Sequence, residues 1–131
     1  MDIQLKLTLL LEIVKSNLFL NIINNVPALK EYGEFVLPFV LEEVEKNKEV
    51  LLFLIEQDPI LSDLLEEIDV TALLEDPASQ SPNIGQVITY LKTTTVMGEM
   101  ERSIVDKLTV EVQKGSLDQQ MQKKKKWFIF F

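Results

Sequence analysis

The chain has 131 residues, 47% of them hydrophobic, and a net charge of −8, and it contains neither cysteine nor histidine. Its length suits one domain, and its hydrophobic content is too high for a disordered chain. Without cysteine and histidine, the chain can form no disulfide, no Cys/His zinc site and no nucleophile–histidine catalytic pair. No metal and no other cofactor is therefore expected.

Negative charge is concentrated in the first part of the sequence. Residues 1–80 hold 16 acidic and 5 basic side chains, whereas residues 81–131 hold 5 acidic and 8 basic ones. Twelve of the acidic residues fall within 42–76. This density repels the phosphates of nucleic acids and favours a protein partner that carries basic charge. The predicted partner-binding face consists of Glu42, Glu43, Glu45, Asp63, Glu66 and Glu67. The alternative is a solvated surface that confers only solubility.

The first segment, residues 3–24, has the pattern of a buried helix. Apolar residues recur at positions 3, 7, 10, 11, 14, 18 and 22, which lie along one helical face. Additional apolar residues beside this row predict burial on more than one side, and they are Leu5, Leu9, Ile13, Leu20 and Ile23. Asn24, Asn25 and Pro27 are expected to end the helix.

Further helices are predicted between residues 28 and 57. The first begins near Ala28 and meets Pro38, an interior proline that would bend it or divide it into two short helices. Asn47 is expected to cap the next helix, residues 48–57. This helix contains the uninterrupted apolar run VLLFLI at 50–55, which predicts a short buried helix, with a buried strand as the alternative.

Two strong helix-start signals and a predicted linker follow. Asp58 and Pro59 combine an acidic N-cap with proline at the first helical position, and Asp69 can cap one more short helix. Residues 76–83, with the sequence DPASQSPN, contain two prolines and two serines and therefore predict a linker.

The region after this linker has mixed local preferences. Residues 84–96 are rich in β-branched side chains, which favour a strand. We nevertheless expect a helix, because Asn83 can cap it and because a single strand would have nothing to pair with. A longer helix is expected to follow and to end before Gly115. Its apolar row consists of Met97, Met100, Ile104, Leu108 and Val112.

These patterns predict an all-α fold, a compact array of about five to seven helices in a single domain over residues 1–122. An irregular bundle is the favoured arrangement. The alternative is a HEAT-like helical stack, since VLPFVLEEVE at 36–45 resembles ILSDLLEEID at 60–69. A solenoid normally needs at least three such units, whereas only two are present.

The last nine residues, KKKKWFIFF at 123–131, form a basic and aromatic tail. Lysines attract an anionic membrane surface and aromatic rings favour the interfacial zone, so peripheral membrane contact is one hypothesis. The contacting residues would be Lys123, Lys124, Lys125, Lys126, Trp127, Phe128, Phe130 and Phe131. A tail that folds back onto the domain or has no role is favoured over membrane contact. Binding of a nucleic acid is the least favoured alternative, because the lysines and aromatic residues form separate blocks. No secretory signal and no stretch of about 20 apolar residues is recognised, so a cytoplasmic location is expected.

The function favoured by these observations is a non-enzymatic protein–protein interaction module, such as an adaptor, an assembly factor or a fragment of a helical scaffold. It would use the acidic helical face within 42–76. Contact with anionic lipid through the tail is the second hypothesis. The third is an enzyme that relies on carboxylate pairs, such as Asp63 with Glu67, or on a divalent ion. No cleft and no phosphate-binding motif supports this third hypothesis.

Overall fold

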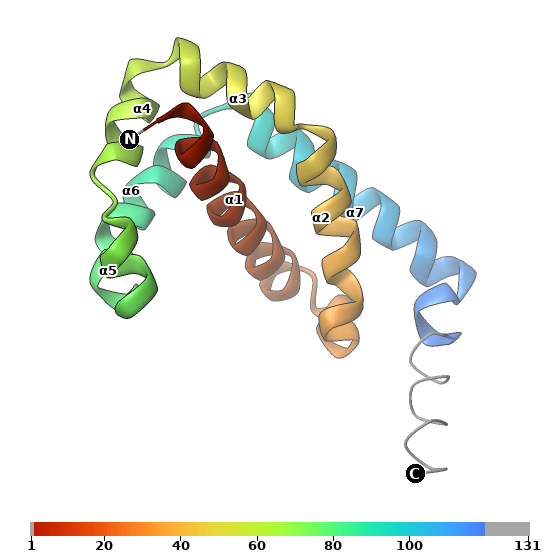
Figure 1. Ribbon diagram of the computed structural model, residues 1–131. Coiled ribbons are helices and arrows are strands. Elements are labelled where there is room, and N and C mark those ends of the chain that lie inside the picture. Colours follow the sequence, from red (N-terminus) through yellow and green to blue (C-terminus); the bar gives the residue numbers. More distant parts are fainter. Residues whose placement is uncertain (1, 120–131) are drawn as a thin grey trace.

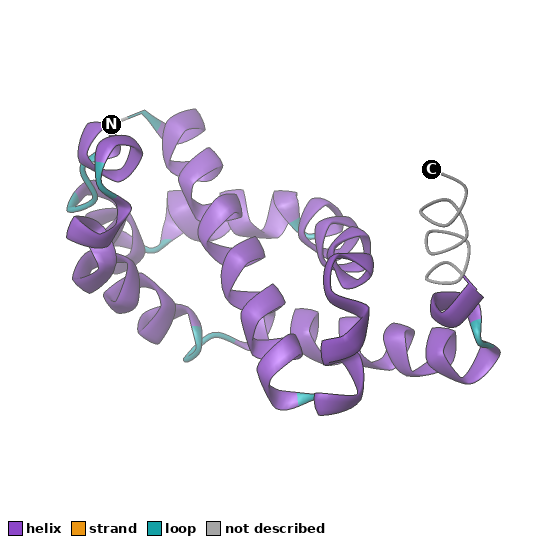
Figure 2. Cartoon of the chain, turned by 90° about the horizontal axis from the view of Figure 1, so that it is seen from below, coloured by secondary structure: helices purple, strands orange, loops and turns teal. Residues whose placement is uncertain are grey.

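The computed structural model describes residues 2–119, and this part of the chain consists of helices joined by short turns, without a strand (Figure 2). The expected all-α fold is thereby confirmed. In chain order the elements are α1 (Ile3–Asn25), the 3-10 helix η1 (Pro27–Val36), α2 (Leu37–Lys46), α3 (Lys48–Gln57), α4 (Pro59–Glu66), α5 (Val70–Glu75), the 3-10 helix η2 (Pro77–Gln80), α6 (Ser81–Leu91) and α7 (Thr95–Lys114).

Helix α1 forms the centre of the array. It packs against η1, α2, α3, α4, α6 and α7, and Figure 1 shows it between the α2–α7 side and the α4–α6 side of the molecule. The predicted apolar row of α1 is buried at Leu7, Leu10, Val14, Leu18 and Ile22, half-buried at Leu11 and exposed at Ile3. The widened row is buried at Leu9 and Ile13, half-buried at Ile23 and exposed at Leu5 and Leu20.

Two predicted helix starts are formed as expected. The Asp58 carboxylate accepts hydrogen bonds from the backbone N–H groups of Ile60 and Leu61, at 3.0 and 3.3 Å, at the start of α4. The Asp69 carboxylate accepts from the Ala72 N–H at 3.1 Å and caps α5. Each bond pairs a backbone donor that has no partner within its own helix.

Pro38 and Gly115 divide the chain where the sequence predicts, and Gly33 adds a further interruption. Pro38 lies in the first turn of α2, so the region before and after it forms two short helices rather than one bent helix. Within η1, Gly33 has a φ of 50° and interrupts the helical geometry. Gly115 has a φ of 75° and ends α7 in the left-handed conformation, which residues with a side chain rarely adopt.

Residues 76–83, predicted as a linker, are mostly helical. Residues 77–80 form η2, and α6 follows directly from Ser81. Proline is favourable in the first turn of a helix, and both prolines of this stretch occupy such positions. Gln80 is buried, and its side-chain oxygen accepts a hydrogen bond from the Asp69 N–H at 3.0 Å, which ties this segment to the start of α5.

Two asparagines make contacts other than the predicted caps. Asn47 does not cap α3, since its side-chain amide donates to the carbonyl oxygen of Glu43 at the end of α2, at 2.8 Å. Asn83 lies inside α6 and donates to the Glu67 carbonyl oxygen at 3.1 Å. Residues 84–96 are helical as predicted up to Leu91, and after a short turn α7 begins at Thr95.

The two similar segments at 36–45 and 60–69 are not buried alike. Val36 is completely buried, whereas its counterpart Ile60 is 57% exposed. Glu43 is buried, whereas its counterpart Glu67 is exposed. Equivalent repeats place equivalent residues in equivalent environments. The difference favours the irregular bundle over the HEAT-like stack.

Leu18 and Leu20 of α1 provide a matched test of the core. Leu18→Ala is expected to lower the free energy of unfolding by about 3 kcal/mol, because it leaves a cavity beside a fully packed helix. Leu20→Ala removes the same atoms from a side chain that is 56% exposed and is expected to cost less than about 1 kcal/mol. Chemical denaturation measures both, and equal losses would contradict the central placement of α1.

Candidate functional site

The structure divides the six predicted partner-binding carboxylates into two groups. They are Glu42, Glu43 and Glu45 on α2, and Asp63, Glu66 and Glu67 at α4 and its C-cap. Helix α2 packs against α1, η1, α3 and α7, whereas α4 packs against α1, α3 and α6. Figure 1 shows α2 and α4 at opposite ends of α3. The predicted residues therefore do not form one continuous face.

Glu43 faces the interior, so its assignment to an exposed partner-binding face is wrong. The residue is 2% exposed, and its carboxylate forms an ion pair with Lys107 of α7. Burial alone would raise the pKa of Glu43, but the hydrogen bond and the charge of Lys107, with smaller effects of Ser103 and Lys46, lower it. Lys107 also lies 3.6 Å from Glu42. Both acids therefore help to hold α2 against α7.

Glu66 is likewise engaged within the fold. Its carboxylate accepts a hydrogen bond from Lys6 Nζ at 2.8 Å, and this bond is the main cause of the lowered pKa of Glu66. Lys6 is 6% exposed and donates also to Ser62 Oγ at 2.6 Å. A buried ammonium group requires such partners. Glu66 thus fastens the start of α1 to α4.

Helix α3 carries an exposed surface that the sequence does not reveal. Leu51 and Ile55 are buried, but Val50 and Phe53 of the run predicted to be buried are 41% and 59% exposed. The flanking acids Glu49 and Glu56 are exposed, and within residues 2–119 neither forms an ion pair. Helical spacing places the Phe53 side chain next to those of Glu49, Val50 and Glu56, which lie three or four positions away. We refer to Glu49, Val50, Phe53 and Glu56 as the α3 surface.

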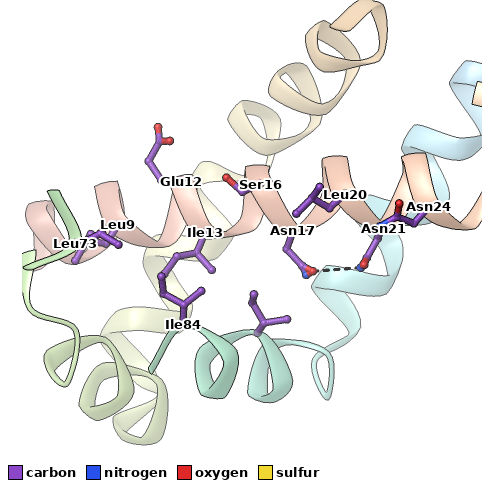
Figure 3. A pocket seen from close by; sticks show the side chains of 11 residues that line it. Leu9, Glu12, Ile13, Ser16, Asn17, Leu20, Asn21, Asn24, Leu73 and Ile84 are labelled. Atoms are coloured by element: carbon purple, nitrogen blue, oxygen red, sulfur yellow. Dashed lines mark hydrogen bonds between the residues drawn. The ribbon is translucent and has the colours of Figure 1, made fainter. Parts of the chain in front are cut away.

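A groove with a volume of about 480 Å³ lies between α1 and the α5–α6 segment (Figure 3). Its apolar lining consists of Leu9, Ile13, Leu20, Leu73, Ile84 and Ile88. Its polar lining comes from α1 alone and consists of Glu12, Ser16, Asn17, Asn21 and Asn24. The sequence pattern does not predict this groove, because its two sides are separated by more than 45 residues of chain.

Asn17 is the most deeply buried polar residue of the groove. It is 7% exposed, and its side-chain oxygen accepts a hydrogen bond from Asn21 Nδ2 at 3.2 Å. Its own Nδ2 has no hydrogen-bond partner among the described residues. Figure 3 shows this amide on the side of α1 that faces α6. A buried donor without a partner is unusual in a folded protein.

No metal site emerges from the described part of the chain. Over residues 2–119, no group of three or more carboxylates is close enough to hold a metal ion. The predicted pair of Asp63 and Glu67 lies at the exposed end of α4. The absence of enzymatic activity stays a prediction.

Helix α1 corrects the expectation that no segment approaches the length of a membrane span. Among the described helices it alone is long and apolar enough by length and composition, with a mean hydropathy of 1.3. The central helix of a soluble protein passes the same test, and 44% of the apolar stretch of α1 is buried. The packing of α1 against six other elements supports the role of a core helix. The cytoplasmic location stays a prediction, and the tail at 123–131 lies outside the described residues.

Comparisons of the chain with family models, with curated proteins and with solved structures found no match.

The Glu43–Lys107 pair predicts a pH-dependent loss of stability. Lys107→Met leaves the buried Glu43 carboxylate without its main partner and is expected to cost about 3 kcal/mol at pH 7. In the wild type the pKa of Glu43 is lowered, so its contribution is present above the unfolded value and disappears as the pH falls through the folded value. In the variant, burial raises this pKa. The difference in the free energy of unfolding between the wild type and Lys107→Met should therefore decrease from pH 7 to pH 4.

The free energy of unfolding at several pH values measures this difference. Lys114→Met is the control, because Lys114 is an exposed lysine of the same helix that forms no ion pair within residues 2–119. A Lys107→Met penalty that is independent of pH would contradict a stabilising ion pair.

Proposed function

We propose that the chain is a non-enzymatic protein-interaction module that binds a basic, amphipathic segment of a partner protein through the α3 surface. The observation that carries this proposal is the exposure of Phe53. A phenylalanine that is 59% exposed leaves apolar area in contact with water, and binding a partner would remove it. Aromatic side chains are frequent anchors at the centres of protein interfaces.

The charges around Phe53 indicate the chemistry of the partner. Glu49 precedes it by four residues and Glu56 follows it by three, so both carboxylates flank the ring on the same helical face. Lysine or arginine side chains on either side of an apolar residue would complement this arrangement. Such complementarity mainly increases the rate and the specificity of association, while the apolar contact supplies most of the affinity.

Only part of the predicted acidic face remains available to a partner. Glu45 and Glu67 remain exposed on the helices that flank α3, and within residues 2–119 neither forms an ion pair. Both carboxylates are therefore available to attract a basic partner at long range. Glu43 and Glu66 are excluded, because both serve contacts within the fold.

Site-specific photocrosslinking tests the proposal. A photoreactive phenylalanine analogue at position 53 is expected to capture a partner through a basic segment, whereas the same analogue at Val110 should not capture it. Val110 is the control because it is 44% exposed on α7, outside the α3 surface. Identical adducts from both positions would overturn the proposal, because they would indicate contact without a preferred surface.

Affinity measurements with the captured segment then separate the two contributions. Phe53→Ala is expected to weaken binding roughly 30-fold, which corresponds to about 2 kcal/mol. Replacement of Glu49 and Glu56 by lysine should slow association and remove its dependence on salt concentration. Because all three side chains are exposed, the free energy of unfolding should change by less than about 0.5 kcal/mol for each substitution. Unchanged affinity in both variants would rule out the α3 surface.

A further inference from the structure

We propose that the groove between α1 and the α5–α6 segment binds an uncharged aliphatic molecule with a carboxamide or other carbonyl group, whose oxygen accepts a hydrogen bond from Asn17 Nδ2. This site is separate from the α3 surface and does not depend on the proposed protein partner. It is assigned from the unpaired Asn17 amide, the composition of the lining and the charge at the rim.

The unpaired amide of Asn17 identifies the polar group of the ligand. Asn17 is 7% exposed, and the hydrogen bond from Asn21 engages its oxygen but leaves Nδ2 without a partner within residues 2–119. Burying a donor without an acceptor destabilises the folded state. A carbonyl oxygen in the groove would supply this acceptor. Asn17 is thus arranged to recognise a ligand rather than to complete the core.

The apolar lining identifies the body of the ligand. Leucine and isoleucine side chains from α1, α5 and α6 surround the space, and no aromatic ring is among the described residues that line it. Such walls suit a flexible aliphatic chain better than a flat ring, which would favour aromatic stacking. A volume of about 480 Å³ lies within the usual range of small-molecule sites.

The charge at the groove excludes an anionic head group. Glu12 is the single ionisable residue among those that line the groove, and its carboxylate is exposed and paired with Lys15 at 2.8 Å. Since no lining residue carries positive charge and Lys15 is already paired with Glu12, a carboxylate or phosphate near Asn17 would have no counter-ion in the groove. An uncharged carbonyl group avoids this penalty.

The lining also sets the orientation of the ligand. Figure 3 shows Asn17 midway along the groove, with Ile13 and Ile84 facing one another on the side that leads to Leu9 and Leu73. The aliphatic body would lie along this apolar side. The carbonyl group would lie at Asn17, next to the polar rim that Asn21 and Asn24 continue.

Octanamide is a suitable probe, because it combines an aliphatic chain with an uncharged amide. Titration of the ¹⁵N-labelled protein is expected to shift the side-chain amide resonances of Asn17 and the backbone amides of the lining residues. Octanoate has the same chain with a negative charge and should bind at least tenfold more weakly. Absence of these shifts up to the solubility limit of octanamide would overturn the proposal, as would equal affinities for the two probes.

Three variants make the test specific to Asn17. Asn17→Leu removes the unpaired donor, so the fold should be retained while octanamide affinity falls about tenfold. Asn25→Leu is the matched control on the same helix, because Asn25 is exposed and outside the lining, and it should leave binding unchanged. Ile88→Phe fills the groove and should abolish binding.

Two results would contradict the proposal directly. Octanamide affinity that is unchanged in Asn17→Leu would show that the amide does not recognise the ligand. Shifts of the lining amides that grow with protein concentration in the absence of octanamide would identify a second copy of the chain as the occupant of the groove.

Discussion

The enclosure of α1 by η1, α2, α3, α4, α6 and α7 determines how the other helices are arranged. A helix that is covered on several sides buries some polar residues along with its apolar row. Lys6 and Asn17 are the two such residues on α1, at 6% and 7% exposure. Lys6 is satisfied by Ser62 and Glu66 of α4, whereas Asn17 receives one hydrogen bond from Asn21. The same packing thus produces a firm contact at one end of α1 and an unpaired amide in its middle.

Features that depend on neighbouring residues could be predicted from the sequence. The caps at Asp58 and Asp69 pair with backbone groups two or three residues away, and Gly115 ends α7 through its own backbone geometry. Asn47 and Asn83 were mispredicted although they are also typical capping residues. Their amides instead donate to carbonyl oxygens at the ends of α2 and α4. Whether such an asparagine caps the following helix or binds the end of a preceding one depends on how the helices pack.

Features that depend on distant residues could not be predicted. The burial of Glu43 requires Lys107, which lies 64 residues later in the chain, and no local pattern distinguishes Glu43 from Glu42 or Glu45. The apolar run at 50–55 reveals a helix, but not that a neighbour covers only one of its sides. The apolar run therefore predicts that Phe53 is buried, whereas the structure shows it exposed. Periodicity shows which side of a helix is apolar, and packing decides how much of that side is covered.

The stability of the short helices also sets the properties of the groove. Helices of six to ten residues are marginal on their own and depend on caps and tertiary contacts. Helix α6 is anchored by the buried Val87 and Leu91, whereas α5 has no buried residue and Leu74 is 80% exposed. Helix α5 is held mainly by the Asp69 cap, by its contact with η2 and by Leu73, which is also its contribution to the groove. Of the three helices that line the groove, α1 and α6 are therefore well packed, whereas α5 is poorly packed. Since local opening begins at the least packed elements, a ligand that contacts Leu73 would order α5 more than any other part of the lining.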